Sequence, residues 1–596
     1  MRQGRLPADA DFQATPAEGG RRQDGRNRVQ AGARLTTREA LFSRLTRAAT
    51  GGILLLFLQT GSEPARAQAV APTASSSFGG RVGSADERSM EGVLVSARRA
   101  GSTISTTVVS DHDGRFDFSP ASLEPGRYTL GIRAIGYELD GPSTVEVAAR
   151  TKAQFEIKLR RARDLAAQLS NTEWLMSMPG GIEQKRPLIE CMSCHTFERV
   201  VRSRYDADGM LAALKRMAGY ANNSTMEFVQ KRAVERKFDE ESLRKLAAYL
   251  ATVNLSKSST WSYELKTLPR PKGRATRVVV TEYDLPRKMI APHDVRTDSE
   301  GRVWYSNFVE NFLGRLDPRT GAHAEFAYPI IKPGAPAGAL ALEADGEGNW
   351  WLAAMFQTGL VKFDVKTEAF RIFRLPPDMN TDASQQSMVM PWQSQVDGKV
   401  WTNEVSKQSI MRLDLASGQY ELIDPFKYLP AGSSHAPYGL AADSMNNLFF
   451  MDFGGEAIGR VDAKTGQSTL YPTPTQRSRP RRTMIDSRGR VWFAEFAANK
   501  VAMFDPKSET FREWEVPTPH TYPYDVFVDR NGGLWSGSMS SDRVLRFDPE
   551  SGRSVEYLLP RQTNIRRVFV DDSTRPVTFW AGSNHGASIV KLVPLD

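Results

Sequence analysis

A repeated pattern in the second half of the chain places the strongest restriction on its fold. Six aromatic residues share the same surroundings. Three positions before each aromatic lies a glycine, or in one case an asparagine, and 13 positions after each aromatic lies an aspartate. Successive aromatic residues are 43 to 50 apart, which is the length of one four-stranded blade. The pattern predicts a seven-bladed β-propeller over about 275–596. Its repeats are centred on Trp304, Trp351, Trp401, Phe449, Trp492, Trp535 and, more loosely, Trp580.

The repeats also predict how the ring closes. Repeats one to six each end with an outer strand, but the seventh reaches Asp596 without one. The unpaired equivalent, VVVTEYDLP at 278–286, lies just before repeat one. We expect this strand to complete the last blade, because that pairing removes an exposed sheet edge.

Two positions of the repeat are expected to lie near the central channel. The residue three positions after each repeat aromatic should end an inner strand. The residue eleven positions before the aromatic should lie close to the end of that strand. Three carboxylates facing one cavity would repel each other unless a divalent cation, protons or an arginine compensated. Polar side chains that simply pair with one another in water are the alternative. The candidate channel residues are His293, Asn307, Glu404, Asp452, Arg481 and Glu495.

The motifs VWFAE at 491–495 and APHDV at 291–295 resemble the streptogramin B lyase (virginiamycin B lyase) family. The resemblance covers about 320 residues and implies a lyase site with a His and a Glu fourteen residues apart in one blade, with magnesium. Glu495 matches the Glu, but Arg481 stands at the His position, and His293 lies in another blade, in register with Asn307. Arginine cannot act as a general base near neutral pH. Lyase activity is therefore not expected, although a cation site at Glu495 remains compatible with the sequence.

The only two cysteines of the chain lie in the pentapeptide CMSCH, a pattern typical of covalent haem c attachment. Thiols three positions apart, Cys191 and Cys194, can each form a thioether to one haem, and the imidazole of His195 can then ligate the iron. A redox CxxC pair would need a thioredoxin-like setting, and zinc would need further ligands. His195 is the only histidine between His112 and His293. We therefore predict haem c as the cofactor.

Residues 161–256 have helical periodicity and are predicted to form an α-helical cytochrome c-like domain. The clearest helix spans 239–253, with Asp239 as its cap and apolar residues on one face. Packing against a core is enough to explain a helix with this pattern. The helix also resembles the C-terminal helix of class I cytochromes c, which packs beside the haem-attachment helix.

The sixth ligand of the iron stays open in the sequence. Met210, Met217 and Met226 follow the CMSCH motif at plausible distances, and Met217 is the preferred ligand. Taken individually, each of them is better explained as an ordinary core residue than as a ligand, because methionine fills irregular gaps. An iron without a sixth protein ligand would instead indicate ligand binding.

Residues 75–160 alternate between polar and apolar types, as in RYTLGIR at 127–133, and turn motifs separate the runs. The motifs DGRF at 113–116 and PGRYTL at 125–130 resemble carboxypeptidase-regulatory-like domains. The resemblance implies a small β-sandwich with a spacer or adhesion role.

The first 67 residues are predicted to be a signal region. Arg44 and Arg47 precede the apolar run ILLLFL at 53–58, and ARA at 65–67 provides a cleavage site. The run is too short to span a bilayer, although an uncleaved anchor is the alternative. We expect a periplasmic or secreted protein with no membrane span after cleavage.

Charge argues against nucleic acid as a partner. Residues 1–67 contain 11 arginines and 6 acidic residues, so the remainder has a formal net charge of +4 instead of +9. No sustained basic stripe with interleaved aromatic residues is present in the sequence.

The sequence thus predicts a multidomain, mainly β protein with a small β-sandwich, an α-helical cytochrome c domain and a seven-bladed β-propeller. The leading hypothesis is an exported c-type haem protein for electron transfer, whose propeller binds a small-molecule substrate or a redox partner protein. One alternative is a lyase that acts in the propeller channel with a divalent cation. The other is a non-catalytic binding module.

Overall fold

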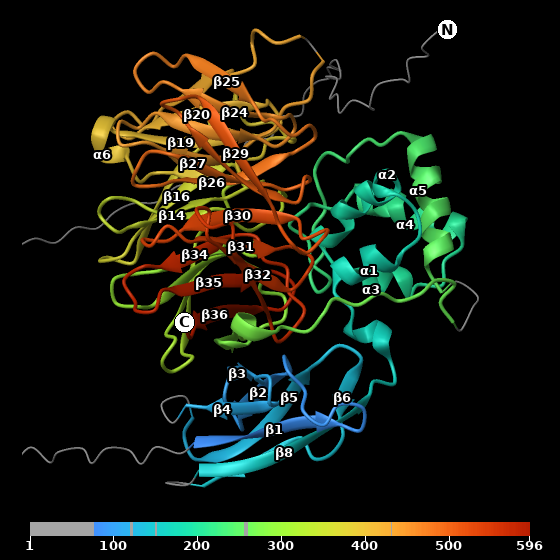
Figure 1. Ribbon diagram of the computed structural model, residues 1–596. Coiled ribbons are helices and arrows are strands. Elements are labelled where there is room, and N and C mark those ends of the chain that lie inside the picture. Colours follow the sequence, from blue (N-terminus) through green and yellow to red (C-terminus); the bar gives the residue numbers. More distant parts are fainter. Residues whose placement is uncertain (1–76, 120–122, 149–151, 256–259, 431) are drawn as a thin grey trace, which may run out of the picture. The chain divides into compact units, whose positions relative to one another are not determined.

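The computed structural model describes residues 77–119, 123–148, 152–255, 260–430 and 432–596 (Figure 1). All of them belong to one compact unit, and the predicted signal region lies outside them. The described part is mainly β, and most of its helices lie in one segment between residues 165 and 253. None of its helices has the length and the apolar character that crossing a bilayer requires.

Eight short strands form the small β domain. One sheet has the order β4-β1-β8-β6, and β3-β2-β5-β7 form the other. Side chains from both sheets, including Phe78, Phe118 and Tyr128, are buried in one apolar cluster. The strands are β1 (Ser77–Ser84), β2 (Leu94–Arg99), β3 (Ile104–Val109), β4 (Arg115–Phe118), β5 (Gly126–Arg133), β6 (Tyr137–Leu139), β7 (Thr144–Val147) and β8 (Lys152–Arg161).

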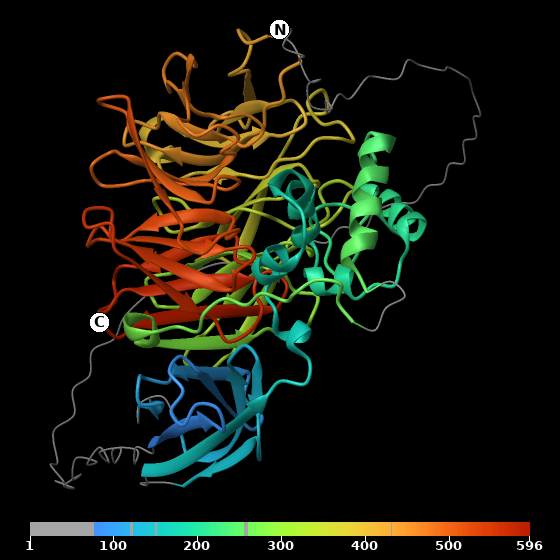
Figure 2. The same ribbon diagram turned by 45° about the vertical axis from the view of Figure 1, so that its right-hand side comes forward.

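The chain after β8 is helical, as its periodicity predicts. The helix α5 begins at the predicted cap, where the Asp239 side chain accepts the backbone N–H of Ser242 at 2.8 Å. It packs against α4 (Figure 2). The helices are η2 (Leu165–Gln168), α1 (Asn171–Ser177), α2 (Ile182–Lys185), η3 (Arg186–Ser193), α3 (Phe197–Val201), α4 (Ala207–Ala218), α5 (Glu240–Val253), η4 (Gly273–Thr276) and α6 (Ser394–Asp397).

Four-stranded sheets follow one another from residue 292 onward, as expected for a propeller-like β domain (Figure 1). Within the described residues, seven groups of four strands correspond to the seven repeats. Blades one to three are β10 (Pro292–Thr297), β11 (Val303–Asn307), β12 (Phe312–Leu316), β13 (His323–Ala327); β14 (Leu342–Ala344), β15 (Trp350–Ala353), β16 (Gly359–Asp364), β17 (Ala369–Arg374); and β18 (Val389–Met390), β19 (Lys399–Glu404), β20 (Ser409–Asp414), β21 (Tyr420–Ile423).

The remaining blades have the same arrangement. Blades four to six are β22 (Pro437–Ala442), β23 (Leu448–Asp452), β24 (Ala457–Val461), β25 (Ser468–Pro472); β26 (Pro480–Ile485), β27 (Val491–Glu495), β28 (Lys500–Asp505), β29 (Thr510–Glu515); and β30 (Pro523–Val528), β31 (Leu534–Ser538), β32 (Arg543–Phe547), β33 (Ser554–Leu558). The seventh is β34 (Val568–Asp571), β35 (Thr578–Ser583), β36 (Ser588–Pro594) and β9 (Val278–Asp284).

The seventh blade confirms the predicted closure. Strand β9 pairs antiparallel with β36, from Val278 opposite Pro594 to Asp284 opposite Ser588. Its other edge pairs with β3 of the small β domain. The result is one sheet of eight strands that runs from the propeller into the small domain.

An aspartate six residues before the repeat aromatic fixes the first hairpin of a blade. In blade five, Asp486 Oδ2 accepts the indole N–H of Trp492 at 2.8 Å, and Oδ1 accepts two backbone N–H groups at 2.9 and 3.0 Å. In blade four, Phe449 offers no indole, and Asp443 Oδ2 accepts the Asn447 side-chain amide instead. Three other blades repeat the Trp bond, in the pairs Asp298–Trp304, Asp345–Trp351 and Asp529–Trp535.

Replacing Asp486 with alanine should lower the free energy of unfolding by about 2–3 kcal/mol, because a buried indole donor and two backbone donors lose their acceptor. Asp443→Ala is the matched control and should cost less, since its blade has no indole donor. Denaturant titration followed by tryptophan fluorescence measures both. Equal losses in the two variants would show that the indole bond contributes nothing.

Candidate functional site

The CMSCH motif lies at the end of η3 and in the turn that follows it. Cys191 and Cys194 are both free thiols. Burial raises the pKa of both, that of Cys191 to about 12. The thiols therefore stay protonated at neutral pH, unlike the low-pKa thiols of redox-active CxxC pairs.

His195 has the tautomer and the charge state of a metal-binding histidine. The side chain is almost fully buried, and its Nδ1–H donates to the carbonyl oxygen of Thr196 at 3.0 Å. Burial lowers the pKa of the imidazole, which is therefore neutral at pH 7. A neutral imidazole held through Nδ1 presents the lone pair of Nε2 to a ligand.

A cavity of about 360 Å³ adjoins Cys194 and His195. Of the three methionines considered from the sequence, its lining contains Met226 and not the preferred Met217, which is half-buried in α4. The other lining residues are Thr196, Glu198, Arg199, Arg202, Thr225, Glu227 and His585.

The segment that contributes Met226 carries an unusual number of exposed apolar side chains. Six large ones within residues 205–238 are at least 36% exposed. Clustered exposure of this kind is expected where an apolar ligand or partner covers the surface. The six are Tyr205, Met226, Phe228, Val229, Val234 and Phe238.

Three propeller side chains contact the CMSCH turn. Asn564 Nδ2 donates to the carbonyl of Met192 at 3.0 Å, and Arg566 Nη2 donates to the carbonyl of Ser193 at 2.6 Å. The Nε2–H of His585 points to the same Ser193 carbonyl at 3.4 Å. None of the three could be predicted from the sequence, because no motif connects residues so far apart in the chain.

Two of the predicted channel residues, His293 and Arg481, meet at Tyr524. His293 Nδ1 lies 2.7 Å from Asp294 Oδ1, and its Nε2 lies 3.4 Å from the Tyr524 hydroxyl. The Arg481 guanidinium carbon lies 3.8 Å from the centre of the Tyr524 ring. Burial lowers the pKa of His293 to about 3 although Asp294 opposes this effect, so the imidazole is neutral.

Asn307, Glu404 and Asp452 instead bind loops of their own blades. Asn307 Oδ1 accepts two backbone N–H groups at 3.2 Å, Glu404 Oε1 accepts one at 2.9 Å, and Asp452 Oδ1 accepts two at 2.9 and 3.0 Å. In the part of the chain that the structure describes, no three His, Cys, Asp or Glu side chains gather to hold a metal. At this position of the repeat, the three side chains therefore bind loops of their own blades, and a shared cavity of carboxylates stays a prediction.

Glu495 occupies the same position of its blade but makes no such bond. Both of its carboxyl oxygens are buried, and no N–H or O–H group of the described residues donates to them. Burial, together with the neighbouring carboxylate of Glu513, raises the pKa of Glu495 to about 8, while Lys500 opposes the shift. The carboxyl group is therefore mainly protonated at pH 7.

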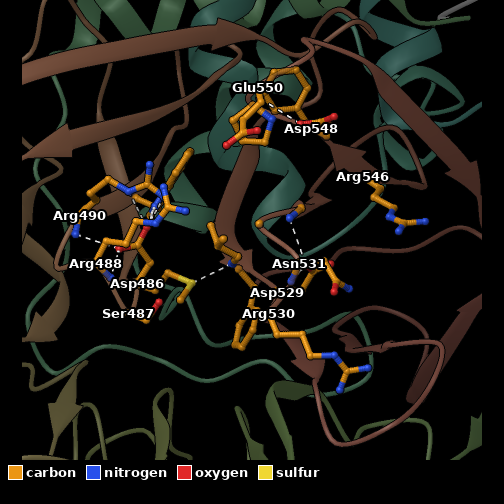
Figure 3. Close-up of a pocket in the computed structure, with 18 of the residues that line it drawn as sticks. Asp486, Ser487, Arg488, Arg490, Asp529, Arg530, Asn531, Arg546, Asp548 and Glu550 are labelled. Carbon is orange, nitrogen blue, oxygen red and sulfur yellow. Dashed lines mark hydrogen bonds and ion pairs between the residues drawn. The ribbon is translucent and has the colours of Figure 1, made fainter.

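A larger cavity of about 850 Å³ lies between hairpins of blades five and six (Figure 3). Its charged side chains are largely paired, as Asp486 is with Arg490, and Asp529 binds the indole of Trp535. Its lining includes none of the candidate channel residues and neither cysteine. It contributes no group to the site described above.

Two parts of the chain match known families. Residues 273–547 match the Virginiamycin B lyase family, and residues 77–160 match the Carboxypeptidase regulatory-like domain. The propeller is virginiamycin B lyase-like. No curated protein shows significant sequence similarity to the chain.

Solved structures similar to the lyase-like propeller share little sequence with it. A streptogramin B lyase structure is 22% identical, with a TM-score of 0.46, and covers 54% of this chain and 100% of its own. The selenomethionine-substituted virginiamycin B lyase from Staphylococcus aureus is 20% identical, with a TM-score of 0.45 and coverages of 53% and 99%. The Cps50 (Swd1) β-propeller domain from Myceliophteria thermophila is 11% identical, with a TM-score of 0.42 and coverages of 52% and 99%.

In the lyase-like propeller, Glu495→Gln should stabilise the protein at alkaline pH. A carboxyl group whose pKa is raised by folding costs stability progressively as pH rises from about 4.3, its unfolded value, to about 8. The amide removes this cost, and a gain of at least about 1 kcal/mol is expected at pH 8.

Glu404→Gln is the matched control for this experiment. Its carboxylate accepts backbone N–H groups at the equivalent position, so the amide should destabilise the protein. Melting temperatures of the wild type and both variants between pH 5 and pH 9 test whether the Glu495 carboxyl group is protonated in the folded protein. A Glu495→Gln variant whose stability falls with pH as steeply as that of the wild type would contradict the assignment.

Proposed function

We propose that this chain is an exported electron-transfer protein that carries haem c on Cys191 and Cys194 and uses its propeller to bind a substrate or a partner protein. The observation that carries the proposal is the neutral His195, whose Nε2 is left available beside a free thiol and a cavity with a thioether. The apolar run and cleavage motif at 53–67 support export.

The residues around the cavity fit this cofactor. Bound haem would supply a centre that gains and loses single electrons. The Thr196 carbonyl orients the imidazole of His195, and both thiols remain protonated and free for thioether formation. The thioether of Met226 would be the best placed additional ligand for the iron, because it lines the same cavity as His195.

The propeller contacts support a joint function of the two domains. Met192 of the CMSCH motif is buried in one apolar cluster with Phe496, Tyr522 and Tyr524 of the propeller. Arg566 of the propeller also contacts the helical segment, since it donates to the Ser193 carbonyl. A ligand bound near Tyr524 would therefore lie beside the turn that holds the haem.

A lyase that acts in the propeller channel is the second candidate, and it is favoured only by the protonated Glu495. The residue at the family's His position is Arg481, whose guanidinium cannot accept a proton near neutral pH. Glu404 and Asp452 are bonded to separate loops, so they do not support a cation site shared with Glu495.

Haem attachment is tested by expression in a host that matures c-type cytochromes. The purified chain should retain one haem after acid-acetone extraction, measured by mass spectrometry and absorption. The Cys191→Ala, Cys194→Ala double variant should lose it, because both thioether bonds are removed. Ser193→Ala changes the same turn without touching a thiol and should retain the haem. A wild-type chain with no retained haem and two thiols that react with an alkylating agent would refute the proposal.

The axial ligand is tested separately by Met226→Ala. This variant should lose the weak absorption band of thioether-ligated oxidised haem and should have a lower reduction potential, because a thioether ligand raises the potential. Met217→Ala should change neither property. The opposite result would restore the preference for Met217 that the sequence suggested.

A further inference from the structure

Arg481 lies among four aromatic rings at the start of β26. Its guanidinium carbon is 3.8 to 5.4 Å from their centres. Together they form the Arg481 cage, which consists of Arg481 and the rings of Tyr438, Phe453, Phe496 and Tyr524. Tyr438 and Phe453 are only partly buried, so one side of the cage remains accessible.

The guanidinium of Arg481 lacks an ionic partner. Among the described residues, no carboxylate pairs with it, and its Nε is buried without a hydrogen-bond partner. The adjacent Arg482 shows the contrast, because it forms two hydrogen bonds with Asp294 at 3.0 and 3.1 Å. A buried donor without an acceptor is costly, and Arg481 is partly exposed, so a ligand with acceptor atoms can reach it.

Positive charge dominates around the cage. Arg479 lies 4.0 Å from the centre of the Phe453 ring that Arg481 also contacts, and Glu190 offsets its charge only in part. The phenol of Tyr524 responds to this field. Burial raises its pKa, but Arg481, Arg566 and Arg482, together with the hydrogen bond to Tyr438, outweigh burial and lower it, whereas burial raises the pKa of Tyr438 itself. The local potential therefore favours an anion.

We propose that the Arg481 cage binds a small aromatic carboxylate. The planar guanidinium can donate two parallel hydrogen bonds to a carboxylate, and aromatic rings offer faces and edges on which a flat apolar group packs. A carboxylate thus satisfies the unpaired cation, and the ring of the ligand covers the accessible aromatic surface.

The inference deepens the proposed function, because it names a ligand class for the propeller beside the CMSCH turn. Arg566 links the two places, because its positive charge lowers the pKa of Tyr524 in the cage and its Nη2 donates to the carbonyl of Ser193. Binding of the carboxylate does not itself require haem, so the two proposals can fail independently.

Isothermal titration calorimetry of the full chain with benzoate tests the site. Benzoate should bind saturably, and the neutral isostere benzamide should bind at least about tenfold more weakly, because charged hydrogen bonds are stronger than neutral ones. Arg481→Gln should weaken benzoate binding at least about tenfold. Arg477→Gln is the matched control, since Arg477 is exposed and lies outside the cage, and it should bind benzoate like the wild type.

The proposal is overturned if benzoate does not bind at about 10 mM, or if Arg481→Gln binds it as the wild type does. Should Arg481→Gln fail to fold, as judged by circular dichroism, the comparison of benzoate with benzamide in the wild type decides. Haem content is measured in the same preparation. Normal haem content without benzoate binding refutes the cage alone, whereas benzoate binding without haem refutes only the electron-transfer function.

Discussion

Strand β9 is hydrogen-bonded along both edges, and the arrangement of the described chain depends on this double pairing. One edge completes the seventh blade through β36, and the other joins β3 of the small β domain. Neither the propeller nor the small domain has a free edge at this place, where an unpaired strand would be a site of aggregation. The helical segment lies between β8 and β9 in the chain, so paired strands precede and follow it.

The fold was largely predictable where local pattern and pairing coincide. The spacing of the Trp residues gave the number of sheets, and the missing outer strand of the last repeat located β9. The cap Asp239 and the apolar spacing after it predicted α5. The pairing of β3 with β9 was not predictable, because edge contacts between distant segments leave no local pattern. The aspartates that bind the indoles, such as Asp486, were overlooked, although an aspartate six residues before the aromatic recurs in five repeats.

The site was predictable only in part. The motif with Cys191, Cys194 and His195 is local, so the sequence alone is enough to find it, and its role in haem attachment stays a prediction. Glu404 and Asp452 lie at strand ends, as predicted, but the bonds that their carboxylates make with loops were not predictable. Their carboxylates bind backbone N–H groups of the following loops, and periodicity carries no information about which N–H groups a loop leaves unpaired. Arg481 was noticed as a departure from the family pattern, yet its aromatic surroundings come from three blades and required the three-dimensional structure.

The bond between Arg566 and Ser193 joins residues 373 positions apart in the chain. Proteins are synthesised from the N-terminus, and early segments emerge while later ones are still missing. The cysteines therefore leave the ribosome long before Asn564 and Arg566, which bind their turn, are synthesised. The propeller closes only when its last strand, β36, pairs with β9. For the haem attachment proposed above, this order of appearance would leave an interval in which an attachment enzyme could reach both sulfur atoms, before the completed propeller encloses the turn.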